Sequence, residues 1–370
     1  MSMLPIIPFY KNLTEIEISV SWFDVCNLKC DFCFEPKCKI RPINYDYCRN
    51  VKFLICEEFE KRLIKFPSAQ GLRMAMWGGE LFMDSIPDDL FSIYQETIDY
   101  VKTTLSKKYP SLYYKIIWAS NGVFEKRDRV LALLKATDSA IGFSYDPVGR
   151  YTTISQLETF KETFSFFKER GYVQCMSITP TKPVIDAIIN SKRGELLPTD
   201  VYIDVNHYIA NSYYERLLPT PAELFKFYKW CVDNEMVNVG ILNSAIVSYF
   251  GLKQDCPRMC DCAACVVIRD GLITTDCVHY STLPKERFYG KYADIVDETN
   301  TNEIKATLGQ MKFNCLNCEH YNHCQMHCWM SVLFDGYNGG CPLKMLYAYL
   351  ATKGRDAMVK MFEDSNFHML

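Results

Sequence analysis

The chain of 370 residues carries a formal net charge of −3, and 49% of its residues are hydrophobic. Such a chain can bury a sizeable core and has room for a barrel-sized domain plus a second module. The near-neutral charge excludes the basic field of a nucleic-acid-binding or anionic-membrane-binding protein. Residues 1–8 lack the pattern of a signal peptide, and no run of about 20 apolar residues predicts a transmembrane helix. We therefore expect a cytoplasmic protein with no nucleic-acid or membrane partner.

Predicted strands and helices alternate through the first half of the chain. The strands are predicted, from apolar alternation or short apolar runs, at 14–22, 72–77, 113–118, 139–145, 172–178 and 201–205. The helices are predicted, from near-helical apolar spacing, at 50–66, 89–107, 126–136 and 154–170. This alternation predicts parallel strands joined by crossover helices, which is an α/β fold.

The segment 181–220 is rich in proline, and we expect it to be mostly loop. Thr220 and Glu223 then form a capping-box pattern with Pro221 at the first helical position, so a helix is predicted to begin there. This helix is expected to end the first domain near residue 235.

Three closely spaced cysteines follow the first predicted strand. Cys26, Cys30 and Cys33 form a C-x3-C-x2-C run. In a cytosolic chain, clustered thiols bind metal or perform redox chemistry more often than they form disulfides. Three thiolates can hold three irons of a [4Fe–4S] cube and leave the fourth iron open to another ligand. A zinc site is the alternative for such a run.

The ends of the later strands carry further candidate residues, because chemistry in a parallel barrel lies at the carboxyl ends of its strands. Gly78-Gly79-Glu80 follows the second strand, and its glycines allow close backbone approach to a ligand. Ser120-Asn121-Gly122 follows the third strand, where an ordinary Asn-Gly turn is the alternative. Ser144-Tyr145-Asp146-Pro147 follows the fourth strand. Ile178-Thr179-Pro180 follows the fifth strand, where we favour a plain loop.

The cysteine spacing, with Phe32 before the third cysteine, resembles the radical S-adenosylmethionine (radical SAM) superfamily, and Gly78-Gly79-Glu80 is similar to its Gly-Gly-Glu motif. The resemblance implies a partial (β/α)6 TIM-type barrel, to which an eight-unit barrel is the alternative. It also implies that the amino and carboxylate groups of SAM chelate the open iron. One electron, from an external donor such as a flavodoxin or ferredoxin, would cleave SAM to a 5′-deoxyadenosyl radical that abstracts hydrogen from the substrate.

The same resemblance implies which residues contact SAM. Glu80 would meet the SAM amino group, Ser144 would touch SAM, and Thr179 would lie near the adenine. Gln156 stands where the family carries an arginine, so Arg150 is the nearest substitute as partner of the SAM carboxylate. The implied SAM-binding set is Phe32, Gly78, Gly79, Glu80, Ser120, Asn121, Ser144, Arg150 and Thr179.

A second cysteine array occupies the last third of the chain and resembles the SPASM module, which binds two auxiliary [4Fe–4S] clusters. By position, the resemblance implies one cluster on Cys256, Cys262, Cys277 and Cys328. It implies the other on Cys315, Cys318, Cys324 and Cys341. Cys260 and Cys265 are rivals for the first two places, and a zinc ribbon is the alternative to the clusters. The chain would thus bind three clusters in two domains, a barrel at 1–235 and a SPASM domain at 236–370.

The remaining metal-binding residue types have no such pattern. Five cysteines are expected to fill core space, namely Cys38, Cys48, Cys56, Cys175 and Cys231. Three histidines thread the last cysteine run, namely His320, His323 and His327. They could donate to cluster sulfurs, and we favour surface positions for them.

Three hypotheses describe the function. The SPASM resemblance favours a maturase that forms a thioether or carbon–carbon crosslink in a ribosomally made peptide. A small-molecule dehydrogenase or epimerase, and a non-catalytic iron–sulfur or zinc protein, are the alternatives. The chain starts almost directly with the first strand, so the peptide leader is expected to bind a separate protein or the barrel itself. Sulfatase-maturing relatives carry an aspartate base where Val278 stands, which argues against formylglycine formation; Asp276 precedes it, and the catalytic acid or base stays open.

Overall fold

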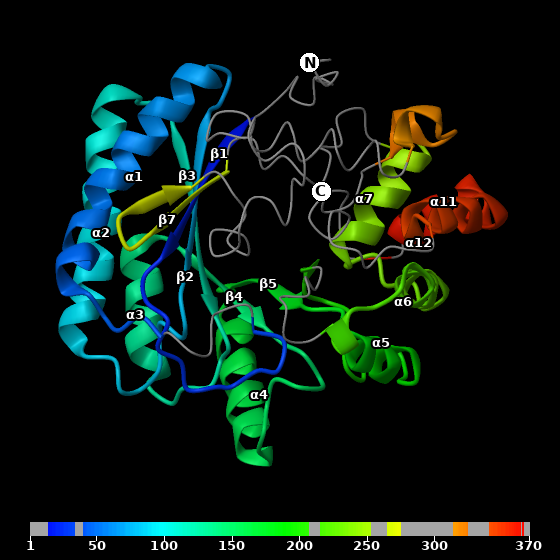
Figure 1. Ribbon diagram of the computed structural model, residues 1–370, viewed down its shortest axis with the longest axis horizontal. Coiled ribbons are helices and arrows are strands. Elements are labelled where there is room, and N and C mark those ends of the chain that lie inside the picture. The colour runs from blue at the N-terminus through cyan, green and yellow to red at the C-terminus, as the bar shows by residue number, and fades with distance from the viewer. Residues whose placement is uncertain are drawn as a thin grey trace.

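The computed structural model describes residues 14–33, 40–206, 215–252, 265–274, 314–324, 340–363 and 365. Within these residues, one sheet of eight strands forms the centre of the molecule, in the order β6-β5-β4-β3-β2-β1-β7-β8 (Figure 1). Its strands are β1 (Glu15–Ser21), β2 (Gly71–Trp77), β3 (Tyr113–Ser120), β4 (Ala140–Ser144), β5 (Val173–Ile178), β6 (Ile203–Val205), β7 (Cys265–Arg269) and β8 (Leu272–Thr274). Strands β1 to β6 are parallel neighbours in chain order, β7 pairs with β1 in parallel, and β8 returns antiparallel to β7.

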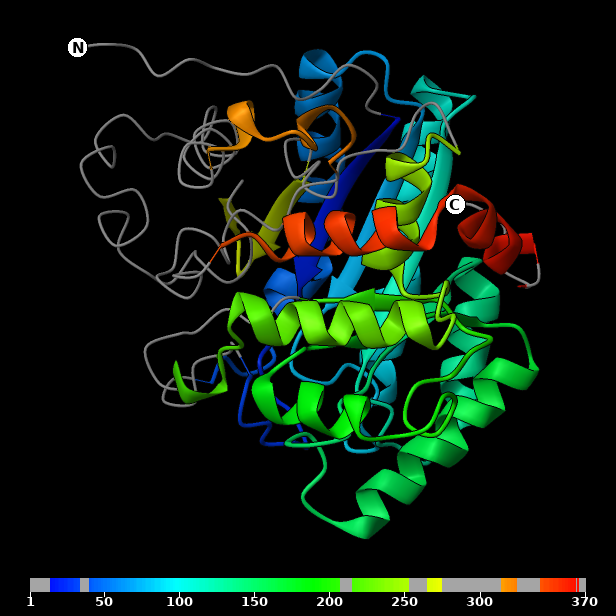
Figure 2. The same ribbon diagram turned by 90° about the vertical axis from the view of Figure 1, so that its right-hand side faces the viewer.

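Helices α1 to α4 lie along one face of this sheet, whereas α5, α6, α7 and α11 gather beyond its β5–β6 end (Figure 1). The described helices are α1 (Tyr45–Lys65), α2 (Asp88–Lys108), α3 (Arg127–Thr137), α4 (Ile154–Glu169), α5 (Lys182–Ile189), α6 (Pro221–Asp233), α7 (Gly240–Tyr249), α11 (Pro342–Lys353) and α12 (Arg355–Glu363). Figure 2 shows α11 running beside α6, against which it packs.

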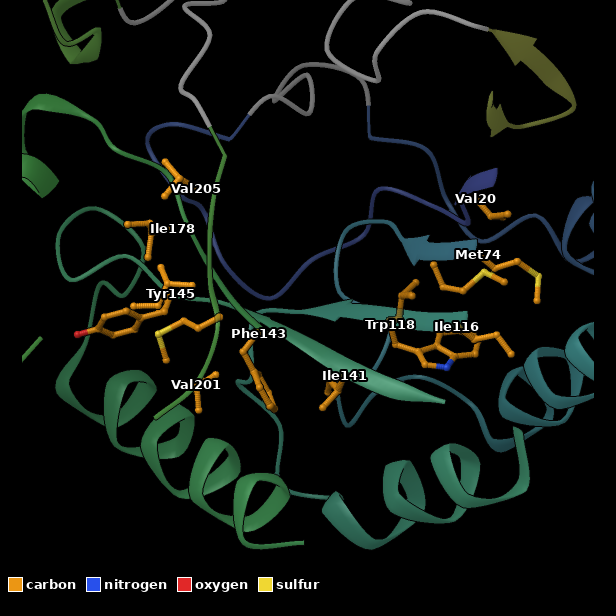
Figure 3. Packing of buried hydrophobic residues seen from close by; sticks show 14 of the residues in the cluster. Val20, Met74, Ile116, Trp118, Ile141, Phe143, Tyr145, Ile178, Val201 and Val205 are labelled. Atoms are coloured by element: carbon orange, nitrogen blue, oxygen red, sulfur yellow. The ribbon is translucent and has the colours of Figure 1, made fainter. Parts of the chain in front are cut away.

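The main core lies between the sheet and helices α1 to α4. Because side chains alternate along a strand, Ile16, Ile18 and Val20 of β1 point to the helices and are fully buried. Figure 3 shows Ile141 and Phe143 of β4 in the same layer, between the strands and the helices. Burying one large apolar side chain stabilises a fold by about 1.5–3 kcal/mol. The opposite face of the sheet is therefore left for polar side chains.

The predicted fold class is confirmed, because six parallel strands in chain order with crossover helices form the open barrel that the sequence indicates. The prediction that 181–220 is mostly loop is wrong for its first part, where α5 forms. Pro183 stands in the first turn of α5. Backbone N–H groups in the first turn make no hydrogen bond within the helix, so a proline there costs none. Helix α1 also begins five residues earlier than predicted, because the Asn44 side chain caps it by accepting from Tyr47 N at 3.2 Å.

The expected capping box at α6 is present, with Thr220 and Glu223 bonded reciprocally. The predicted domain boundary near residue 235 stays a prediction. Beyond it, Val239 bridges to Ile203 of β6, so the chain continues along the same sheet edge. Among the helices described, none combines the length and the apolar character that a membrane span requires.

Candidate functional site

The three cysteines of the first run lie in the loop after β1, at the carboxyl edge of the sheet. Cys33 N donates to Cys30 O at 3.2 Å, which closes a turn between these two thiol-bearing residues. Leu28, Cys30 and Phe32 are buried together in a small apolar cluster. Local packing therefore fixes the loop that carries the thiols.

Electrostatics suit this loop to bind a cation. The pKa of the Cys26 thiol is raised to about 12, mainly by desolvation; the nearby Glu80, Cys30 and Cys33 also raise it, and the hydrogen bond from Leu28 N lowers it. Without a metal, Cys26 therefore stays protonated, because neighbouring thiolates would repel one another. A bound metal reverses this preference for the neutral thiol, because it deprotonates its thiol ligands.

The donor set is compatible with an iron–sulfur cube. Within the described ranges, no three His, Cys, Asp or Glu side chains are placed to hold one metal ion. A cube gives each thiolate a separate iron, so the three sulfurs need not meet at one point. Cys30 and Cys33 lie close enough to Cys26 to raise the pKa of its thiol, and three neighbouring thiols are the donors that three irons of a [4Fe–4S] cluster take.

The loop after β2 is held directly against the cysteine loop. Gly79 N donates to Phe23 O at 2.6 Å, and Glu80 N donates to Val25 O at 2.9 Å. A Cβ atom on Gly79 would overlap the Val25 carbonyl. The glycine is thus required by close backbone approach to the residue before Cys26.

Gly79→Ala is expected to destabilise the protein by about 1–3 kcal/mol, because the Val25 backbone cannot move aside as a side chain could. It should also reduce the iron bound after reconstitution, since Cys26 follows Val25 directly. Urea unfolding and iron counting measure the two effects. Gly171→Ala, at a position with φ of +74° and no neighbouring atom within 4 Å, is the matched control, which should lose stability but keep its iron. Full iron loading of the Gly79 variant would contradict the assignment.

Glu80 joins the ends of β2 and β3. Its side chain is fully buried, and its Oε1 accepts from Phe82 N at 3.0 Å and from Ser120 Oγ at 2.9 Å. Its Oε2 accepts from Asn121 N at 2.6 Å. Burial raises the pKa of Glu80 to about 7 even though these hydrogen bonds lower it. The carboxyl group is therefore fixed in position and changes charge near neutral pH.

Asn121 connects the end of β3 to the cysteine loop. Its Nδ2 donates to Asn27 Oδ1 at 2.9 Å and to Cys26 Sγ at 3.6 Å. Gly122 has φ of +73°, as the Asn-Gly turn interpretation requires, and the SAM-binding interpretation stays a prediction. The turn directs the Asn121 amide toward the Cys26 thiol.

The segment after β4 carries Arg150, whose pairing with the SAM carboxylate stays a prediction. Arg150 forms an ion pair at 2.6 Å with Asp146, whose side chain is 0% exposed. Thr179 N also donates to Asp146, at 2.6 Å. Ser144 is half-buried at the end of β4, and its carbonyl accepts from Tyr151. Asp146 thus links the segment after β4, through Arg150, to the end of β5, through Thr179 N. Its motif did not predict this role.

A third buried carboxylate, Asp24, closes the cysteine loop and was not among the predicted site residues. Its Oδ1 accepts from Arg41 at 2.7 Å, and Asp24 N donates to Arg41 O at 3.1 Å. Arg269 of β7 approaches the same carboxylate at 3.2 Å. Asp24 therefore joins both ends of the loop to β7. The available signal was an acidic residue two positions before the first cysteine.

The C-terminal array is described only in part. Five of its cysteines lie outside the described residues, namely Cys256, Cys260, Cys262, Cys277 and Cys328. Burial raises the pKa of Cys341 to about 11, and the nearby thiols of Cys324 and Cys318 add to the shift. Three of the four cysteines expected in one auxiliary site therefore lie close together, and Cys318 N donates to the carbonyl of the fourth, Cys315, at 2.9 Å.

Other cysteines and histidines divide between confirmed and wrong predictions. Cys48, Cys56 and Cys231 are buried as core residues, whereas Cys175 is half-buried and Cys38 lies outside the described residues. The rival ligand Cys265 lies in β7 and faces Glu17, with Sγ at 3.9 Å from Oε1.

The surface position favoured for the histidines is wrong for His320. It is buried, and its ring contacts Tyr249 and Tyr347. These two tyrosines, from α7 and α11, cover the His320 ring. His323 is half-buried beside it, and His327 lies outside the described residues.

Comparison with solved structures identifies the fold as that of radical SAM enzymes. The structure titled native anSMEcpe with bound AdoMet and Kp18Cys peptide, an anaerobic sulfatase-maturating enzyme, is 14% identical and covers 94% of this chain and 98% of its own, with a TM-score of 0.62. A polyhistidine-tagged form of anSMEcpe with bound AdoMet is 16% identical, with the same coverages and a TM-score of 0.60.

A weaker likeness joins the chain to Streptococcus suis SuiB bound to its precursor peptide SuiA. It is 15% identical and covers 89% of this chain and 75% of that chain, with a TM-score of 0.47. No family model and no curated protein sequence matches the chain.

Proposed function

We propose that this protein is a radical SAM enzyme. The observation that carries the proposal is the convergence of three thiols with Gly79, Glu80 and Asn121 at the carboxyl edge of a partial barrel. Cys26, Cys30 and Cys33 would each bind one iron of a cube. When bound, the cluster and SAM supply a 5′-deoxyadenosyl radical.

The chain's own residues would bind and orient SAM around this centre. Gly78 and Gly79 bring backbone close to the cysteine loop, so the SAM methionine group could lie against the main chain there. Glu80 offers a fixed carboxylate to the SAM ammonium group, and Ser120 holds that carboxylate in place. Phe32 lies beside the cluster ligands and limits access of water, because it is buried.

The auxiliary clusters remain part of the proposal. The proximity of Cys318, Cys324 and Cys341 supports one of them. The other rests on the resemblance of the sequence alone. A zinc site is the competing occupant of both arrays.

The inner face of the sheet is the proposed substrate side. Glu17, Arg73 and Asp204 point into it, opposite to the apolar side chains that face the helices. Arg73 is 3.6 Å from Glu17, and its buried Nε has no hydrogen-bond partner among the described atoms. This polar floor supports a substrate with hydrogen-bond acceptors. A peptide offers such groups along its whole length, and anSMEcpe carries a peptide in its structure.

The substrate is therefore proposed to be a ribosomally made peptide, modified by a thioether or carbon–carbon crosslink. An external flavodoxin or ferredoxin would deliver the electron, and a separate protein is proposed to present the peptide leader. Incubation with candidate peptides encoded beside the gene, followed by mass spectrometry, tests the substrate class. Modification of a small molecule and of no peptide would replace this proposal by the dehydrogenase or epimerase hypothesis.

The enzyme class is tested without knowing the substrate. The protein is reconstituted anaerobically with iron and sulfide, reduced, and incubated with SAM. We expect 5′-deoxyadenosine and about twelve irons per chain if three cubes form. About four irons would remove the auxiliary clusters from the proposal. Tightly bound zinc in the first cysteine run, with no SAM cleavage, would overturn the enzyme class.

A further inference from the structure

The guanidinium of Arg150 already has a partner at each of its nitrogens. Its Nε and one terminal nitrogen donate to Asp146 Oδ2 at 2.8 and 2.6 Å. The other terminal nitrogen donates to Cys30 Sγ at 3.8 Å. The same group lies over the Phe32 ring, 5.1 Å from its centre. Arg150 is thus bound to the cysteine loop itself, in the place where a SAM carboxylate partner was expected.

The segment that carries Arg150 is fixed on the cysteine loop by backbone contacts as well. Asp31 N donates to Gly149 O at 3.3 Å, and Cys30 Sγ lies 4.0 Å from Arg150 O. Asp146 is completely buried and is held by Thr179 N at the end of β5. If the Arg150 guanidinium moved away from Cys30, the buried Asp146 carboxylate would lose its cationic partner.

A permanent positive charge beside a cluster thiolate changes the energy of reduction. An arginine guanidinium keeps its positive charge in proteins, and the ion pair with Asp146 stabilises that charge, so the charge is present at every working pH. Reduction adds one negative charge to the cluster, and hydrogen bonds to its sulfurs and nearby charge are the protein's means of setting its potential. A cation and an N–H donor at one ligand sulfur favour the reduced state.

We propose that Arg150 raises the reduction potential of the SAM-binding cluster by donating to the Cys30 thiolate, and that Asp146 positions it there. This inference rests on the proposed function, in which one electron from a flavodoxin or ferredoxin reduces the cluster before SAM is cleaved. In this assignment Arg150 tunes the cluster through Cys30, Asp146 is the positioning residue, and the SAM carboxylate is bound by another group.

The test is an anaerobic redox titration of the reconstituted full chain, followed by electron paramagnetic resonance, together with equilibrium dialysis of SAM. Arg150→Gln should lower the midpoint potential by the equivalent of at least about a tenfold change in the reduction equilibrium, about 59 mV for one electron. Its Kd for SAM should change by less than about threefold, because a charge that does not touch the ligand contributes little. Arg127→Gln, which removes an arginine paired with Glu162 on α4, should leave both values unchanged.

A second variant guards against loss of folding. Arg150→Gln leaves Asp146 buried without its cation, so the double variant Asp146→Asn/Arg150→Gln keeps the site neutral and should also show a potential below that of the unaltered protein. An unchanged potential in both variants would overturn the inference, as would a Kd for SAM raised by about 30-fold or more, the loss expected for a broken charge pair. Absence of a reducible cluster in the unaltered protein would instead refute the proposed function.

Discussion

Cys30→Ala is expected to abolish the reductive cleavage of SAM. Cys30 is the middle thiol of the run and is buried beside Phe32, and its loss removes one of the three proposed iron ligands. Loss of a group outside the ligand sphere already costs about 10–100-fold in metal affinity or activity, and loss of a ligand should exceed that. The measurements are iron per chain after reconstitution and the amount of 5′-deoxyadenosine formed.

Two further cysteine variants separate this effect from general loss of a thiol. Cys56→Ala removes a thiol buried on α1, far along the chain from the run, and should keep both its iron and SAM cleavage. Cys318→Ala affects only the proposed auxiliary site, so it should spare SAM cleavage more than formation of product. Retention of the full iron content and of 5′-deoxyadenosine by Cys30→Ala would contradict the assignment of the run as the SAM-binding cluster.

The barrel could be predicted because its signals are local. In β1 the residues Ile16, Ile18 and Val20 alternate with polar ones and are fully buried in the structure, although the intervening Ser19 and Ser21 are buried as well. The short helix α5 was missed because the prolines of the segment 181–220 were interpreted as loop signals, although Pro183 stands where proline suits a helix. Whether a proline ends a helix or begins one depends on its position in the helix, and the proline content of a segment does not give that position.

The site could be predicted where a motif is contiguous and could not where it depends on packing. Cys26 and Gly79 stand in short patterns that fix their own geometry. Asp24 and its partner Arg269 are 245 residues apart, and only the pairing of β1 with β7 brings them together. The role of Arg150 likewise depends on how the segment after β4 is placed against the cysteine loop, which no pattern near it in the sequence encodes.

Dependence on packing also explains why the pKa of Glu80 could not be predicted from its motif. A glutamate after two glycines suggests an exposed turn, yet Glu80 is fully buried between the ends of β2 and β3. Three donors then hold its carboxylate while burial raises its pKa. The consequence is a group that ionises in the working pH range, and this gives the second large expected effect.

Glu80→Gln is expected to weaken SAM binding by about 2–5 kcal/mol at pH 8, because the variant loses the charge that would pair with the SAM ammonium group. In the unaltered protein, ionisation of Glu80 with a pKa of about 7 makes this pairing depend on pH. Below pH 7 the carboxyl group is protonated, so the affinity should fall by up to about tenfold for each pH unit. Above pH 7 the affinity should level off, and the variant should show a flat profile.

The free energy of unfolding should also depend on pH through Glu80, and it should decrease as pH rises. Because the pKa of Glu80 in the folded, SAM-free protein lies above its ordinary value of 4.5, the folded state binds more protons than the unfolded state between pH 4.5 and 7. Its stability should therefore decrease, by about 3 kcal/mol from this group, as pH rises through that window. Glu80→Gln should remove the decrease, while an unpaired donor beside its amide costs it about 1–3 kcal/mol at low pH.

Equilibrium dialysis of SAM and urea unfolding, each between pH 5 and 8.5, measure the two profiles. Glu96→Gln is the matched control, since Glu96 is exposed on α2 and should change neither. If the Glu80 variant binds SAM with the same slope against pH as the unaltered protein, the titrating group is another one, and the carboxylate at the end of β2 then holds the β3 end in place without pairing with SAM. If only the unfolding profile changes, Glu80 is buried and titrates as described, and the SAM ammonium group binds elsewhere on the carboxyl edge.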